Sequence, residues 1–307
     1  MRRCIGWICC WSLVLLFFFG APAVAGAQNP ATVGVEKKPA PPLLYKSHRR
    51  GIYKNGEGVE VIDATPQSPP LDVDDPGVPE RGEYEVNFTS DADLSRPQRD
   101  INLLIVDANY GLVPRVFGHE LPTQVKLEFP VSGAKEPDQS YRIGIGEAGF
   151  GLKFNFYNNE RRGASLAFYP QLEFAMPGSG AVEKGIAEDG QTLILPLLLQ
   201  KEFKYLTFVA NGAVNKPIHD SERDMTGTLA LGFGRAITGH LSVMADIHGD
   251  SAFDFNHDRL IAADIAVMRR IRGTIIYFKI GHSLVSDGVP GHTYLGIGMK
   301  LTGMPGH

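Results

Sequence analysis

The chain has 307 residues, of which 43% are hydrophobic, and its formal net charge is −4. That acidic balance argues against a nucleic-acid-binding protein, so no nucleic-acid partner is expected. The length allows one large barrel or two ordinary domains.

Residues 1–27 have the three parts of a secretory signal peptide. Arg2 and Arg3 form the positive end, residues 5–19 the apolar core, and residues 25–27 the small-residue cleavage site. A transmembrane anchor is the alternative, but it needs a longer apolar run. No later segment reaches the 18 apolar residues of a membrane-spanning helix. Without the two leader arginines, the net charge falls from −4 to −6.

All three cysteines lie in this leader: Cys4, Cys9 and Cys10. A mature chain without cysteine has no disulfide, no thiolate metal site and no cysteine nucleophile. We therefore expect no cofactor, and no metal site is predicted from the sequence.

Residues 28–80 differ in composition from the rest of the chain, because nine prolines are scattered among charged residues. Such a segment buries little apolar surface, and we expect a disordered periplasmic arm. A partner-binding arm and a plug inside a lumen are the alternatives.

Residues 146–177 show the pattern that continues to the end of the chain. Phe150, Leu152, Phe154 and Phe156 share one parity, and polar residues or glycines occupy the other. Alternation with period two predicts a strand, and two such strands about a polar turn predict a hairpin. Each strand has about ten residues, enough for a tilted strand to cross a bilayer.

The same alternation predicts an all-β fold over residues 81–307: a transmembrane antiparallel up-and-down β-barrel of about 12 strands. The expected strands are 82–89, 101–112, 124–131, 146–157, 163–174, 191–202, 205–216, 225–235, 240–248, 259–268, 273–282 and 292–302. Connections after the even strands are short, beginning with residues 113–115, and those after the odd strands are longer. An even strand number places both termini on the short-turn, periplasmic rim.

Charged residues of these strands fall on the parity opposite to the apolar one, and we expect them to line the lumen. They are Glu83, Glu85, Asp107, Lys126, Glu128, Lys153, Glu173, Asp246, Asp264, Lys279 and Lys300. A charge facing lipid near mid-membrane costs about 2–4 kcal/mol, so this separation favours a membrane barrel over a large soluble β-sandwich. Pro170 and Pro196 fall inside strands, and we expect local bulges at both.

Three short motifs suggest other chemistry. Gly144, Gly146 and Gly149 form G-x-G-x-x-G, but a strand follows where a nucleotide site needs a helix. Residues 254–258 begin like a calcium loop and lack its later glycine and glutamate.

His240 and Ser242 stand two apart on one strand, as in certain outer-membrane lipid hydrolases, where the imidazole activates the hydroxyl. The pair follows a short turn, however, and so lies at the periplasmic rim. Outer-leaflet hydrolysis needs the opposite rim. We expect no enzymatic activity.

Several stretches, in this order, resemble one bacterial family: Gly82-Glu83-Tyr84-Glu85-Val86-Asn87, Asp107 to Leu112, GEAGFGLKFNF at 146–156, YPQLEF at 169–174 and LILPLLL at 193–199. The chain from about Asp75 to Leu301 is similar to the MetA-pathway of phenol degradation family, whose members are outer-membrane, transporter-like barrels. Pro170 and Pro196, the two prolines inside expected strands, both lie in these stretches. The resemblance implies passage of small aromatic or other organic compounds.

We therefore predict a barrel in the bacterial outer membrane through which small solutes pass. The expected partners are a small-molecule solute, outer-membrane lipid and the barrel-assembly machinery. The first alternative is a closed barrel acting as a structural or binding module through its long loops. The second is a lipid hydrolase using His240 and Ser242.

Overall fold

The computed structural model describes residues 45–47, 52–54, 60–95, 99–135, 140–218, 223–252, 259–287 and 291–303. All regular elements among them are strands. Three precede the barrel, β1 (Tyr45–Ser47), β2 (Ile52–Lys54) and β3 (Glu60–Ile62), and they pair with one another. Among these described residues, no helix has the length and hydropathy to cross a membrane.

The remaining strands follow in chain order, and all but β6 and β7 belong to one antiparallel sheet. They are β4 (Tyr84–Asp93), β5 (Arg99–Leu112), β6 (Arg115–Val116), β7 (His119–Glu120), β8 (Thr123–Lys135), β9 (Arg142–Ile145), β10 (Glu147–Asn159), β11 (Ala164–Phe168), β12 (Gln171–Ala175), β13 (Gln191–Glu202), β14 (Thr207–Ile218), β15 (Thr226–Thr238), β16 (Leu241–Ala252), β17 (Leu260–Ile271), β18 (Thr274–Ser286) and β19 (Thr293–Gly303).

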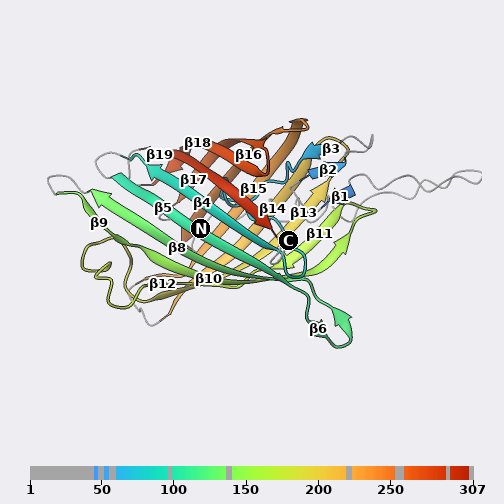
Figure 1. The fold of residues 1–307 in the computed structure, drawn as a ribbon. Coiled ribbons are helices and arrows are strands. Elements are labelled where there is room, and N and C mark those ends of the chain that lie inside the picture. Colours follow the sequence, from blue (N-terminus) through green and yellow to red (C-terminus); the bar gives the residue numbers. More distant parts are fainter. Residues whose placement is uncertain are drawn as a thin grey trace, which may run out of the picture. The chain divides into compact units, whose positions relative to one another are not determined.

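Antiparallel pairing closes these strands into a barrel (Figure 1). β9 continues into β10, and β11 into β12, so each pair crosses the barrel as one strand. β19 pairs with β4 over ten residues, which joins the last strand of the chain to the first strand of the barrel. The closed barrel thus has 12 strands, and the predicted all-β transmembrane fold is confirmed.

The two faces of each strand differ as the alternation predicts. On β18, Phe278 and Ile280 are 49% and 48% exposed, whereas Tyr277, the neighbour of Phe278 on the same strand, points inward and is 2% exposed. The exposed face is apolar around the barrel, and the inner face carries the buried polar and charged side chains. A continuous apolar outer surface is stable when it contacts lipid tails.

The two prolines do not produce the predicted bulges. The ladder opens at Tyr169 and Pro170, between β11 and β12, but Phe168 faces Leu197 and Gln171 faces Ile194 in one unbroken register. Pro196 stays within β13, directly beside this gap. The two prolines, which lack a backbone N–H, therefore lie at the same local interruption of the strand pairing. The nearby bulge lies instead in β10, between Asn155 and Tyr157.

The connection between β5 and β8, residues 113–122, also differs from the expected one. This connection between β5 and β8 is a small hairpin, β6 paired with β7, rather than a three-residue turn. Phe117 at its tip has a φ of 50° and is 97% exposed. A non-glycine residue in this left-handed region is strained. By contrast, the short connections expected after the eighth and tenth strands are present, as two-residue turns at residues 239–240 and 272–273.

Candidate functional site: the lumen and the segment inside it

Residues 60–80, which we call the lumen segment, pack inside the barrel. Ile62, Leu71 and Val73 are at most 1% exposed. They form one buried cluster with inward-facing wall residues: Val209, Ala230, Met244, Ala266, Met268, Ile275 and Tyr277. For residues 60–80 the structure thus differs from the expected disordered arm and agrees with the plug alternative. Of residues 28–59, only 45–47 and 52–54 fall within the described part of the chain.

Three glycines of the wall give the segment the room that it occupies. A Cβ at Gly234 of β15 would lie 1.8 Å from the carbonyl oxygen of Ala64. A Cβ at Gly232 would lie 2.7 Å from side-chain atoms of Pro66 and Val73. On β5, a Cβ at Gly111 would lie 2.0 Å from the carbonyl oxygen of Glu80. The backbone of the segment therefore lies directly against the wall at both of its ends.

Wall side chains bind the middle of the segment through its backbone. The Asn211 side chain accepts a hydrogen bond from Asp74 N at 2.5 Å and donates one to Asp74 O at 2.7 Å. Lys153 Nζ donates to Asp75 O, and Asn155 Nδ2 donates to Pro76 O, each at 2.8 Å. These bonds satisfy backbone groups that would otherwise be buried without partners.

Side chains of the segment make polar contacts as well. Lys300 Nζ donates to Gln67 Oε1 at 2.8 Å. Lys279 Nζ donates to Asp72 Oδ2 at 2.7 Å, and the backbone N of Asp72 donates to Asp246 Oδ2 at 2.9 Å. The segment is thus held by both charged and neutral groups of the wall.

The charged residues predicted to line the lumen all lie on the inner face of the sheet, where each is buried or half-buried. Most form ion pairs. Lys300 lies 2.9 Å from Glu85, and Lys126 lies 2.8 Å from Glu128 and 3.9 Å from Asp107. Glu83 accepts a hydrogen bond from Glu80 N at the start of β4. Their part in solute passage remains a prediction.

The other predicted residues lie elsewhere around the lumen. Lys153 contacts the lumen segment, and Glu173 is half-buried on β12. Lys279, Asp246 and Asp264 gather around Asp72. The wall is therefore not a uniform ring of charge, because its acids and bases pair locally.

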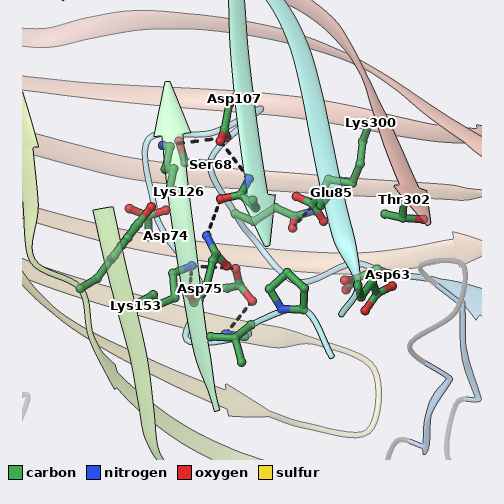
Figure 2. A pocket seen from close by; sticks show the side chains of 18 of the residues that line it. Asp63, Ser68, Asp74, Asp75, Glu85, Asp107, Lys126, Lys153, Lys300 and Thr302 are labelled. Carbon is green, nitrogen blue, oxygen red and sulfur yellow. Dashed lines mark hydrogen bonds and ion pairs between the residues drawn. The ribbon is translucent and has the colours of Figure 1, made fainter. Parts of the chain in front are cut away.

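Two cavities adjoin the lumen segment. One, of about 110 Å³, is lined by charged wall residues that include Glu85, Asp107 and Lys126 (Figure 2). The other, of about 520 Å³, is lined by residues at the short-turn ends of β10, β11 and β13. Gly77, Val78 and Pro79 line both cavities. This limb of the segment is therefore a wall that the two cavities share.

Two acids of the lumen segment, Asp72 and Asp74, have pKa values shifted in opposite directions. Burial raises the pKa of Asp74, and Lys153 and Lys126 offset this only in part. Burial also acts to raise the pKa of Asp72, but Lys279 and the neighbouring hydrogen bonds outweigh it and hold that pKa below its ordinary value. Asp72 is thus an anion that the wall stabilises.

The motifs that suggested other chemistry do not form sites in the described residues. Ser242 is fully buried and its hydroxyl has no hydrogen-bond partner there, while His240 is exposed at the turn. The imidazole therefore does not activate this hydroxyl. Gly149 lies in β10, as expected, whereas Gly144 lies in β9, within what was expected to be a long connection. Asp254, Asn256 and Asp258 lie outside the described residues.

Sequence reasoning missed the docking of the segment, although two signals were present. Glycines occupy inward positions at 111, 232 and 234, and asparagines occupy inward positions at 155 and 211. Small residues on an inner wall mark a close backbone approach. Asparagines there can pair with an extended chain, because they both donate and accept hydrogen bonds.

Comparisons with known proteins bear on the fold. No family model matches the chain, and no curated protein matches it. Among solved structures, it is similar to the COG4313 outer membrane channel from Pseudomonas putida F1, with 10% identity, a TM-score of 0.56, and coverage of 74% of this chain and 97% of that one. For the NanC porin the values are 7%, 0.47, 70% and 98%. At 10% identity the first likeness shows the fold alone, a closed antiparallel β-barrel.

Proposed function

We propose that this protein lies in the bacterial outer membrane and lets small solutes pass through its lumen. The observation that carries the proposal is the closed barrel with an apolar outer face and a charged, hydrogen-bonding interior. A polar interior of this kind supports an aqueous path whose charges tune selectivity. The fold likeness to an outer membrane channel supports the same reading.

The lumen segment determines when such a path is open. In the conformation described, residues 60–80 pack against the inner wall, and we infer that they obstruct the path, so passage requires the segment to move. The limb Gly77–Pro79 is the part whose displacement would join the two cavities. We infer that the barrel is a gated channel, closed in this conformation.

Aromatic and other small organic compounds are the solute class that we propose. This finer proposal rests on the resemblance to the MetA-pathway of phenol degradation family. The fold likeness to a COG4313 outer membrane channel supports it, because that family is COG4313-like. Twelve strands enclose a modest interior, which favours small solutes over large ones.

One observation favours a second candidate, a permanently closed barrel that acts as a binding module. The lumen segment is held by many polar contacts, and the wall glycines fit its backbone closely. A barrel of this kind would present its long loops to a partner and conduct nothing.

Single-channel recording in a planar bilayer distinguishes the two candidates. We expect the full mature chain to conduct rarely and a variant lacking residues 28–80, which removes the whole lumen segment, to conduct in discrete steps. In the deleted variant, Glu173→Lys should shift ion preference toward anions, because Glu173 faces the lumen. Glu183→Lys is the matched control, since Glu183 is exposed on the connection between β12 and β13. A folded deletion variant that conducts nothing would overturn the channel proposal.

A further inference from the structure

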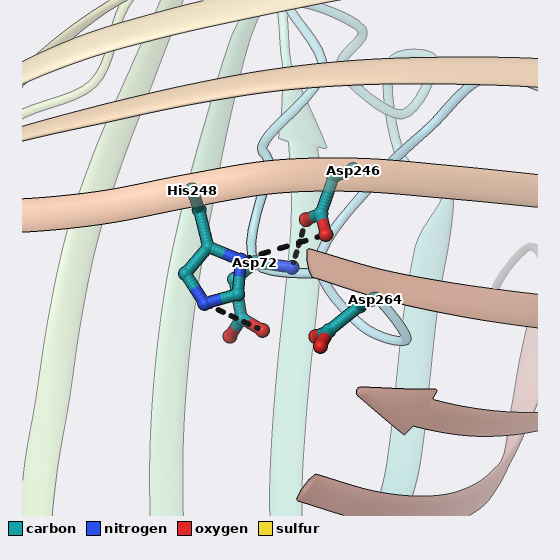
Figure 3. Close-up of side chains that lie close together, drawn as sticks. All are labelled: Asp72, Asp246, His248 and Asp264. Atoms are coloured by element: carbon teal, nitrogen blue, oxygen red, sulfur yellow. Dashed lines mark hydrogen bonds and ion pairs between the residues drawn. The ribbon is translucent and has the colours of Figure 1, made fainter. Parts of the chain in front are cut away.

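Four side chains from three parts of the chain converge beside the lumen segment (Figure 3). Asp72 comes from the segment, Asp246 and His248 come from β16, and Asp264 comes from β17. One nitrogen or oxygen atom from each lies within 4.8 Å of those from all the others. Asp246 and Asp264 face each other directly in the β16–β17 ladder, which fixes two of the four positions on the rigid wall.

The cluster holds more negative charge than the lysine beside it neutralises. Lys279 Nζ lies 2.7 Å from Asp72 Oδ2 and 3.0 Å from Asp264 Oδ2. One ammonium opposite three carboxylates leaves two negative charges when His248 is neutral. Asp246 and Asp264 are buried and Asp72 is exposed, and three carboxylates this close cannot all remain ionised without a further cation or shared protons. A divalent cation would balance the remaining charge.

Asp264 gives an independent indication of a missing partner. It is 1% exposed, and its Oδ1 atom has no hydrogen-bond partner within the described part of the chain. Figure 3 shows its carboxylate pointing toward Asp72 and His248. A Cβ at the facing Gly281 would lie 1.5 Å from this oxygen, so the glycine keeps the space that the carboxylate occupies. A buried carboxylate oxygen without a partner is unfavourable unless a ligand binds it.

His248 is oriented as a ligand. Its Nδ1 atom lies 3.5 Å from Asp246 Oδ1, and its Nε2 atom lies 3.8 Å from Asp72 Oδ2. A carboxylate beside one ring nitrogen favours the tautomer that leaves the other nitrogen free to bind a metal. The Nε2 atom therefore faces the cluster as the nitrogen donor.

We propose that Asp72, Asp246, His248 and Asp264 bind one divalent transition-metal ion, Mn²⁺ or Zn²⁺. Carboxylates combined with an imidazole suit these ions, whereas Ca²⁺ prefers oxygen ligands throughout. The four ligand atoms lie within 4.8 Å of one another, whereas ligands of a tetrahedral ion with bonds of about 2.1 Å lie about 3.4 Å apart, so the side chains must move inward by about 1 Å to bind it. Lys279 Nζ, which contacts the Oδ2 atoms of Asp72 and Asp264, competes with the ion for these carboxylates.

The ion would join the lumen segment to two strands of the wall, because Asp72 belongs to the segment and the other ligands do not. Metal binding thus stabilises the docked segment. The site itself does not depend on solute passage, and its test uses no conductance measurement. Failure of one proposal therefore leaves the other standing.

The test is isothermal titration of the metal-stripped, full-length mature protein in detergent with MnCl₂ and with ZnCl₂. We expect one ion per chain, and at least a tenfold loss of affinity in Asp264→Asn. Asp93→Asn is the matched control, because Asp93 pairs with a single imidazole, that of His292, at 2.7 Å, and also has a buried oxygen without a partner. This variant should bind the ion as the parent does.

Two further variants keep the test decisive if Asp264→Asn fails to fold. His248→Gln should weaken binding, and Lys279→Met should strengthen it, because a competing positive charge is removed. Folding of each variant is checked by its heat-dependent migration on a gel. Absence of binding at 1 mM metal by both the parent and Lys279→Met, or equal binding by the parent and His248→Gln, would overturn the proposal.

Discussion

The side-chain amide of Asn211 in the wall binds both backbone groups of Asp74: it accepts a hydrogen bond from the N–H at 2.5 Å and donates one to the carbonyl oxygen at 2.7 Å. The amide side chain thus does what a neighbouring strand would do for an extended chain. Because the recognition is through the backbone, the geometry of the wall fixes the place of the segment more than the identity of residue 74 does.

Asn211→Leu should loosen the lumen segment. It removes two hydrogen bonds and leaves the buried Asp74 backbone groups without partners, which costs about 2–3 kcal/mol of docking free energy. Cleavage by endoproteinase Asp-N, which cuts before aspartates such as Asp63 and Asp72, should then become at least tenfold faster. Asn215→Leu is the control, because Asn215 on the same strand donates to two wall threonines, Thr226 and Thr228, rather than to the segment. Equal cleavage of both variants would contradict this role of Asn211.

Gly111→Ala should displace the limb of the segment that leads into β4. The new methyl group would lie 2.0 Å from Glu80 O and 2.4 Å from Pro79 O, and these backbone atoms must move. We expect more frequent channel openings in a planar bilayer. Gly212→Ala tests a glycine whose added Cβ meets nothing closer than Leu229 at 3.5 Å, so its currents should match those of the parent. Unchanged currents in Gly111→Ala would show that this limb does not close the path.

Lys300→Met should destabilise the barrel together with its segment. Lys300 is 6% exposed and binds both Glu85, at 2.9 Å, and Gln67, at 2.8 Å. Removing the cation leaves a partly buried carboxylate unpaired, which costs about 3 kcal/mol. The double variant with Glu85→Gln should recover part of the loss. Urea-induced unfolding in detergent measures both, and a double variant less stable than Lys300→Met would contradict the pairing.

Phe117→Gly should stabilise the hairpin formed by β6 and β7. Phe117 has a φ of 50° and is 97% exposed, so its ring contributes no packing within the described residues. Glycine adopts this conformation freely, and the gain should be about 1 kcal/mol. Urea unfolding of the two proteins makes the comparison. A loss of stability in lipid vesicles but not in detergent would show that the ring contacts the bilayer.

The barrel could be predicted because each strand carries its own signal. Alternation in residues such as Phe150 to Phe156 sets both the strand and its lipid face without reference to any distant residue. The connection at residues 113–122 was harder to predict, since Val113-Pro114-Arg115 reads as a turn and the hairpin forms beyond it.

The lumen segment could not be predicted by the same reasoning. Its apolar residues are few, and three of them, Ile62, Leu71 and Val73, are buried only because a wall formed much later in the chain surrounds them. Asp72 binds a residue 174 positions away. Composition therefore indicates disorder, whereas the partners of the segment are supplied by the barrel.

The pairing of β19 with β4 has a consequence for how the molecule assembles. Residues 60–80 leave the ribosome before any barrel strand, but the wall residues that bind them extend as far as Lys300, 233 positions beyond Gln67. The contact between Gln67 and Lys300 therefore forms only once the last strand is in place. Contacts of such high sequence separation slow folding, because a long stretch of chain must be closed before they form. A chain that lacks β19 should have neither a closed barrel nor a fully docked segment.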